Sequence, residues 1–174
     1  MVAAESIQVE PVLDIRELYS TLQPRLFRFG LAFSGSETRA AEAVQEAFLD
    51  LLCNPGCVDP ARGSASALLY GMVRNRLRSA RRAEREEPIE DDSAVDEELL
   101  LHLERAQRIA AVREAIFLLP EHYREVVLLC EIEECSYEDA AAALGLPIGT
   151  IRSRLNRAKR QMKLRLMQFE GNSL

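Results

Sequence analysis

The strongest constraint on the fold lies near the C-terminus, in residues 136–160. Ser136 is a preferred residue for the start of a helix, and Gly145 is a preferred residue just past the end of one. After Pro147, apolar residues return at helical spacing over residues 148–166, which contain basic residues and no acidic ones. The sequence therefore predicts a helix-turn-helix: two helices that pack through small residues, with a glycine at the turn.

The basic helix stands out because the chain as a whole is acidic, with a formal net charge of −6. Residues 84–104 contain ten acidic side chains and Arg85 as the single basic one, so this segment alone outweighs the net charge. The basic helix therefore predicts a surface that faces phosphates. The alternative is a helical hairpin whose outer helix is merely solvated. Small-residue packing, the glycine turn and the acid-free helix together favour nucleic-acid binding.

The rest of the chain has helical periodicity and no strand pattern. Pro24 divides the first apolar stretch, so residues 13–22 and 24–33 are expected to form two helices or one kinked helix. Ser36 should cap the next helix, whose inner stripe includes Leu52. A further helix is expected over residues 64–85, although the sequence does not explain Gly71 in its middle. Another is expected over residues 99–119, with Ile109 and Val112 on one face. The next should begin at Pro120.

The composition changes at the acidic segment, which has few apolar residues and contains Pro88, so we expect it to be a flexible linker. The chain is then divided into an N-terminal tail (residues 1–12), a first helical domain (13–85), the linker (86–104) and a second helical domain (105–170). The predicted fold class is all-α, with two small helical domains joined by a flexible acidic linker and a helix-turn-helix in the second.

No pattern in the sequence points to catalysis, a cofactor or a metal: no nucleophile–base pair, ligand cluster or phosphate loop is found. The four cysteines Cys53, Cys57, Cys130 and Cys135 lack the spacing of a zinc knuckle. We expect reduced thiols that serve as small apolar residues, with redox sensing as the alternative. Without a signal pattern or a long apolar run, we expect a cytoplasmic chain with no membrane insertion.

Several motifs together resemble the extracytoplasmic-function (ECF) group of sigma factors in the sigma-70 family. Residues 44–49 (Val-Gln-Glu-Ala-Phe-Leu) resemble the helix with which the family binds the polymerase clamp, and residues 69–75 (Leu-Tyr-Gly-Met-Val-Arg-Asn) resemble its helix for the −10 promoter element. Residues 118–120 and 149–158 resemble its −35 domain. The similarity spans about residues 18–166 apart from the linker. The sequence departs from the pattern at Arg39, Ala61, Ala65 and Leu68.

The resemblance implies a transcription initiation factor that is not an enzyme: core RNA polymerase supplies the catalysis, and this chain supplies the recognition of promoter DNA under the control of an anti-sigma protein. It implies a core-binding set comprising Glu42, Gln45, Glu46 and Asp50. It implies a −10 set comprising Arg74, Asn75, Arg78, Arg81 and Arg82. It implies a −35 set comprising Thr150, Arg152, Ser153, Asn156, Arg157, Lys159 and Arg160.

Two other functions compete with this interpretation. A free-standing helix-turn-helix regulator would explain the second domain but would leave the motifs of the first domain without a role. A sigma-mimic adaptor that titrates an anti-sigma protein should lack the basic recognition helix, which is intact in this sequence.

Overall fold

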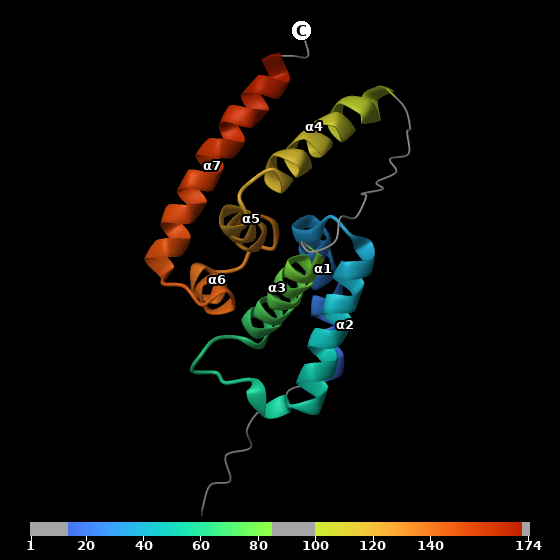
Figure 1. Ribbon diagram of the computed structural model, residues 1–174, viewed down its shortest axis with the longest axis vertical. Helices are drawn as coiled ribbons and strands as arrows, with labels where there is room; N and C mark the ends of the chain where they lie inside the picture. The colour runs from blue at the N-terminus through green and yellow to red at the C-terminus, as the bar shows by residue number, and fades with distance from the viewer. Residues whose placement is uncertain (1–13, 85–99, 172–174) are drawn as a thin grey trace, which may run out of the picture.

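The computed structural model describes residues 14–84 and 100–171, and the helices among them form an N-terminal and a C-terminal unit (Figure 1). The N-terminal unit contains α1 (Ile15–Ser34), α2 (Glu37–Cys53), the 3₁₀ turn η1 (Pro55–Cys57) and α3 (Ala65–Glu84). The C-terminal unit contains α4 (Leu100–Phe117), α5 (Glu121–Val127), the π-helical turn η2 (Leu128–Ile132), α6 (Tyr137–Leu144) and α7 (Ile148–Gly171). The described residues contain no strand, which confirms the all-α prediction.

The predicted tail and most of the predicted linker lie outside the described residues. Helix α4 begins at Leu100, close to the start of the helix expected over residues 99–119, and its first turn overlaps the range 86–104 that we assigned to the linker. Helix α1 continues through Pro24, so this stretch forms one helix.

Local capping chemistry sets the helix ends that the sequence predicted. Ser36 accepts a hydrogen bond from the backbone N–H of Arg39 at the start of α2. At the start of α6, the Ser136 hydroxyl oxygen accepts one from the Asp139 backbone N–H at 3.0 Å. Gly145 ends α6 in the left-handed conformation, with φ of +64°. These contacts satisfy backbone groups that would otherwise lack partners at helix ends.

The π-helical turn η2 joins α5 to the helix-turn-helix and was not predicted. The backbone N–H of Glu133 donates to the carbonyl oxygen of Leu128 at 2.9 Å, five residues back. After this turn the Glu133 side chain points into the protein, where the residue is 1% exposed. Glu134 then takes φ of +52°, a left-handed conformation that a side chain makes unfavourable.

The two units pack directly against each other. Figure 1 shows α5 and α6 lying between α7 and α3. Helix α3 contacts α6, and α1 contacts both α4 and η2. Buried apolar side chains from both units, including Leu69 and Val73 of α3 and Ala140 and Ala143 of α6, form one continuous core. The helices of both units therefore share one packed core.

Some residues expected in buried stripes are exposed. Leu52 is 54% exposed at the end of α2, and Ile109 is 44% and Val112 36% exposed on α4. Helix α4 instead packs through the face that carries Ala111 and Ala115, both of which are buried.

The expectation of small, apolar thiols holds for only one pair of cysteines. Cys53 and Cys57 are exposed, because they lie at the end of α2 and in η1, where the chain leaves the core. Cys130 and Cys135 are partly buried and pack against the core.

Candidate nucleic-acid interface

The predicted core-binding residues share one exposed face of α2. Helical spacing turns Ala43, Val44, Ala47 and Phe48 into the core, so the residues between them point outward. The outward residues of α2 include the four that the resemblance implied, all of which are exposed: Glu42, Gln45, Glu46 and Asp50. The structure therefore brings this predicted set together.

Arg76 of α3 organises part of this face, and the sequence analysis did not identify it. Its guanidinium binds the Glu46 carboxylate, with Nε 2.8 Å from Oε2, and it also pairs with Asp50. The acidic side chains remain more than half exposed, so the ion pairs themselves add little stability. Their effect is to hold two carboxylates in one orientation. No local pattern indicates this contact, because it depends on how α2 packs on α3.

Exposed apolar side chains border the acidic face. Leu49 is 49% exposed and Leu52 is 54% exposed, and Tyr19 of α1 is 50% exposed with its ring edge-on to Phe48 at 4.8 Å. Neighbouring exposed apolar side chains rimmed by polar groups are typical of a surface that binds another protein.

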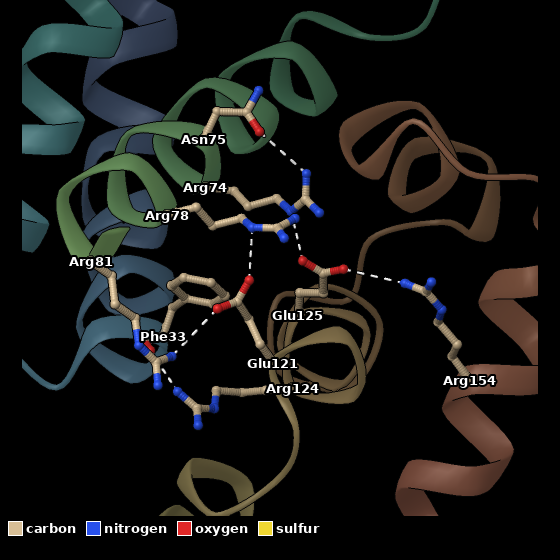
Figure 2. Close-up of polar contacts among 9 residues, drawn as sticks. All are labelled: Phe33, Arg74, Asn75, Arg78, Arg81, Glu121, Arg124, Glu125 and Arg154. Carbon is tan, nitrogen blue, oxygen red and sulfur yellow. Dashed lines mark hydrogen bonds and ion pairs between the residues drawn. The ribbon is translucent and has the colours of Figure 1, made fainter. Parts of the chain in front are cut away.

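Arg74, Arg78 and Arg81 form a basic ridge along α3 that faces the C-terminal unit, where acidic side chains of α5 meet it (Figure 2). Arg74 Nε lies 2.6 Å from Glu125 Oε2, and the two side chains are only 12% and 1% exposed. Glu121 binds two further members of the ridge, with Arg78 Nε at 2.7 Å and Arg81 Nη1 at 3.4 Å. Three residues of the predicted −10 set thus pair with carboxylates of the same chain.

The other two residues of the −10 set, Asn75 and Arg82, are exposed. The Asn75 side-chain oxygen accepts a hydrogen bond from Nη1 of Arg74 at 3.2 Å (Figure 2). Asn75 is thereby positioned beside the ridge with its amide group directed outward.

Glu125 also binds Arg154 of α7, whose Nη1 lies 3.4 Å from Glu125 Oε1 (Figure 2). One buried carboxylate therefore joins the ridge of α3 to α7. Neither partner was predicted from the sequence, because Arg154 lies within the family motif but outside the −35 set. The available signal was a pair of glutamates, Glu121 and Glu125, four residues apart on one helix face.

Arg124, next to Glu125, is buried and donates hydrogen bonds to backbone carbonyls. Its acceptors are the oxygens of Phe33 at 2.9 Å, Leu119 at 3.1 Å and Phe117, whose ring also lies 4.6 Å from the guanidinium. Burial lowers the pKa of Arg124, and the nearby Arg81 cation lowers it further. Because Phe33 is in the last turn of α1, Arg124 completes that helix end from the other unit.

Glu133 forms a second polar contact between the units. Its Oε2 atom accepts a hydrogen bond from the Tyr70 hydroxyl at 3.1 Å and lies 3.2 Å from Arg25 Nε and 3.4 Å from Arg28 Nη2. Burial and the negative charge of Glu133 raise the pKa of Tyr70 far above its ordinary range. These partners belong to α1 and α3, so the contact links the N-terminal unit to the turn that precedes the helix-turn-helix.

The predicted −35 residues lie together on the first half of α7. Ile151, Leu155 and Ala158 are buried on the inner face of this helix. Thr150 is partly buried, and the remaining members of the set are exposed on the outer face: Arg152, Ser153, Asn156, Arg157, Lys159 and Arg160. Unlike the ridge of α3, this face is open to solvent.

Local contacts position parts of the α7 face. The Arg152 guanidinium lies 5.7 Å from the ring centre of Tyr137 at the start of α6, within the range of a cation–π contact. Lys159 Nζ lies 2.8 Å from Glu131 Oε1, and this hydrogen bond raises the pKa of Lys159. The Ser153 hydroxyl donates to the Thr150 carbonyl oxygen at 3.0 Å.

Within residues 14–84 and 100–171, no helix is long and apolar enough to cross a membrane. In the same residues, no three His, Cys, Asp or Glu side chains come together as a metal site would require.

Comparison with known proteins identifies the class. The family model for Sigma-70 region 2 matches residues 18–87, and that for Sigma-70, region 4 matches residues 109–162. The chain is 35% identical to the ECF RNA polymerase sigma factor EcfG of Rhodopseudomonas palustris over 168 residues, which cover 92% of this chain and 90% of EcfG. These two regions define a sigma-70-type protein.

Two solved structures share the fold. One is the sigma factor RpoE of Bartonella quintana in complex with the anti-sigma factor NepR, with a TM-score of 0.71 and 25% identity over 88% of this chain and 97% of that chain. The other is CnrH in complex with the cytosolic domain of CnrY, with a TM-score of 0.66 and 24% identity over 88% of each chain. The protein belongs to the ECF RNA polymerase sigma factors.

Proposed function

We propose that this ECF sigma factor directs core RNA polymerase to promoters through three separate surfaces, on α2, α3 and α7. The observation that carries the proposal is the acid-free face of α7, which is exposed on a helix-turn-helix in a chain that also matches the second sigma region. Recognition helices of this motif place their first residues in the DNA major groove.

The α2 face supplies the contact with core polymerase. Its carboxylates form a negative surface with apolar neighbours, which suits a basic partner surface with an apolar component. Because Arg76 holds Glu46 and Asp50 in place, the partner meets carboxylates that are already oriented.

The α3 surface supplies the −10 contact. Asn75 carries an amide that can donate and accept together, which allows it to read the edge of an unstacked base. Arg74, Arg78, Arg81 and Arg82 supply positive charge along one helix for the DNA backbone.

The α7 surface supplies the −35 contact. Arg152 and Arg157 are exposed near the start of the helix, and guanidinium groups pair with guanine in a two-pronged geometry. Ser153 and Asn156 provide uncharged donors and acceptors beside them. Thr150, Lys159 and Arg160 complete the surface toward the DNA backbone.

An anti-sigma protein is the proposed regulator, supported by the two similar folds solved as complexes with NepR and with the cytosolic domain of CnrY. The proposed place of action is the cytoplasm, where core polymerase and promoter DNA are found. The chain itself contributes specificity and no catalytic step.

The test is transcription by core RNA polymerase with and without the purified chain, on a library of promoter fragments. We expect promoter-specific transcripts only when the chain is present. Glu46→Lys reverses one charge on the α2 face and should abolish core binding in a pull-down, whereas Glu17→Lys, an exposed change on α1, should not. A chain that binds DNA without supporting transcription would be a regulator, and one that binds only an anti-sigma protein would be a mimic.

A further inference from the structure

The α3 ridge proposed to contact the −10 element is covered by the chain's own C-terminal unit. Arg74 is nearly buried in its pair with Glu125, and the charges of the partly exposed Arg78 and Arg81 are neutralised by Glu121, so these arginines offer little free positive charge to DNA phosphates. The acid-free face of α7 is exposed in the same structure. One of the two proposed DNA-contacting surfaces therefore has most of its positive charge neutralised, with only Asn75 and Arg82 free of these carboxylates, while the other surface is available.

Helix α6 of the C-terminal unit packs unusually close to the backbone of α3. A Cβ atom added at Gly71 of α3 would lie 2.9 Å from the carbonyl oxygen of Ala143 in α6. A Cβ atom at Gly63, just before α3, would lie 2.8 Å from Cβ of Ala142. Distances this short are not tolerated, so α6 reaches α3 only because both positions are glycine. This contact explains the mid-helix Gly71, for which the sequence offered no reason.

The carboxylates of α5 bind the arginines of the α3 ridge as DNA phosphates would. Glu121 and Glu125 are four residues apart, so both point from one face of the helix toward α3 (Figure 2). An arginine guanidinium binds a carboxylate and a phosphate through the same forked geometry. The acidic face of α5 therefore supplies the ridge with negatively charged hydrogen-bond acceptors, as a stretch of DNA backbone would.

The two partners of Glu125 differ in what happens when the units separate. Arg154 belongs to the same unit as Glu125, so it continues to neutralise this carboxylate. Arg74 belongs to the other unit and loses its anion, which makes it available to a phosphate. Separation therefore leaves Glu125 paired and activates the ridge.

We propose that the carboxylate face of α5 is an intramolecular mimic of DNA, which closes the free chain by occupying the α3 ridge and which −10 DNA must displace. This inference rests on the proposed function of α3 as the −10 surface. In the closed chain α7 can bind duplex DNA, and α3 becomes available only after α5 and α6 move away.

Two variants should open the chain by independent routes. Gly71→Ala adds a methyl group against the Ala143 carbonyl without changing any charge. Glu125→Gln removes the buried charge that holds Arg74 without adding bulk. Glu138→Gln is the matched control, because it makes the same charge change at an exposed position on α6. Small-angle X-ray scattering of the full chain should give a larger radius of gyration for both opening variants and an unchanged one for the control.

DNA binding tests the mimicry itself. The probe is a fluorescent single-stranded oligonucleotide of random sequence, because contacts with phosphates do not depend on sequence. Affinity should rise about tenfold in both opening variants, since apparent affinity scales with the fraction of open chain. The control should differ little from the wild type. Circular dichroism verifies that each variant is folded.

The results separate this inference from the proposed function. Folded opening variants that keep the wild-type radius, or that expand without gaining affinity, would overturn the inference. If the variants expand without gaining affinity, the proposed function still stands provided that Arg82→Ala weakens promoter opening by the reconstituted polymerase. If Arg82→Ala and Asn75→Ala both leave −10 recognition unchanged, the proposed role of α3 is wrong, and the inference fails with it.

Discussion

Replacement of Arg124 by methionine should be among the most destabilising single changes in this chain. Methionine keeps most of the side-chain length but removes every donor. Three carbonyl oxygens would lose their partner: those of Phe33, Phe117 and Leu119. Arg124 is only 6% exposed, so water cannot easily replace the lost donors.

The size of the effect follows from two opposing contributions. Each hydrogen bond from a charged donor contributes roughly 1.5–3 kcal/mol, so three together contribute roughly 4.5–9 kcal/mol. Removing the cation also removes the cost of burying it, and Nε of Arg124 has no hydrogen-bond partner among the described residues. We therefore expect a net loss on the order of 3–5 kcal/mol in the free energy of unfolding.

Urea unfolding followed by circular dichroism measures this loss. For a chain of this length, it corresponds to a fall of roughly 6–20 °C in the melting temperature. Arg157→Met is the control, because Arg157 is exposed on α7 and its loss should change stability by less than about 0.5 kcal/mol. A loss below about 1 kcal/mol for Arg124→Met would show that these carbonyls find other partners and would refute the reasoning.

Three further predictions concern single sites. Glu134→Gly relieves the positive φ and should stabilise the chain by about 0.5–1 kcal/mol in urea unfolding; a loss of stability would contradict this. Arg152→Ala should cost roughly 1–3 kcal/mol of DNA-binding free energy and relax the preference at one base pair. Lys163 is exposed further along α7, and Lys163→Ala should weaken binding to all sequences alike. Titration against a −35 library can show the difference. A uniform loss for Arg152→Ala would exclude base reading. Burial raises the pKa of the Cys130 and Cys135 thiols to about 11, so the folded chain holds these protons more tightly than the unfolded chain. Stability should therefore fall between about pH 8.5 and pH 11, and the Cys130→Ser/Cys135→Ser double variant should show a smaller fall.

Features set by neighbouring residues could be predicted from the sequence. Ser36, Ser136 and Gly145 act within three or four residues of their own positions, so their capping roles follow from residue type and spacing. The outward faces of α2 and α7 were predictable for the same reason: periodic apolar residues fix which side is buried, and the remaining residues must point outward. The roles of these faces in binding polymerase and DNA stay predictions.

Features set by packing between the units could not be predicted. The role of Gly71 depends on the backbone of α6, which is about seventy residues away in the sequence. The occupation of Arg74, Arg78 and Arg81 by α5 likewise requires the relative position of the two units. The exposure of Ile109 and Val112 depends on which face of α4 meets its neighbours, and an apolar stripe alone does not specify this.

The π-helical turn η2 has a consequence for how insertions and deletions act in this protein. A π turn contains one more residue than the α-helical turn that it replaces, and each residue of an α-helix advances the direction of the side chain by about 100°. Deletion of one residue within 128–132 would restore ordinary helical geometry and rotate Glu133 away from Arg25 and Tyr70. The deletion would leave the composition of the helix almost unchanged. The pairing of the two units through Glu133 thus depends on the length of this turn as much as on the identity of the residue.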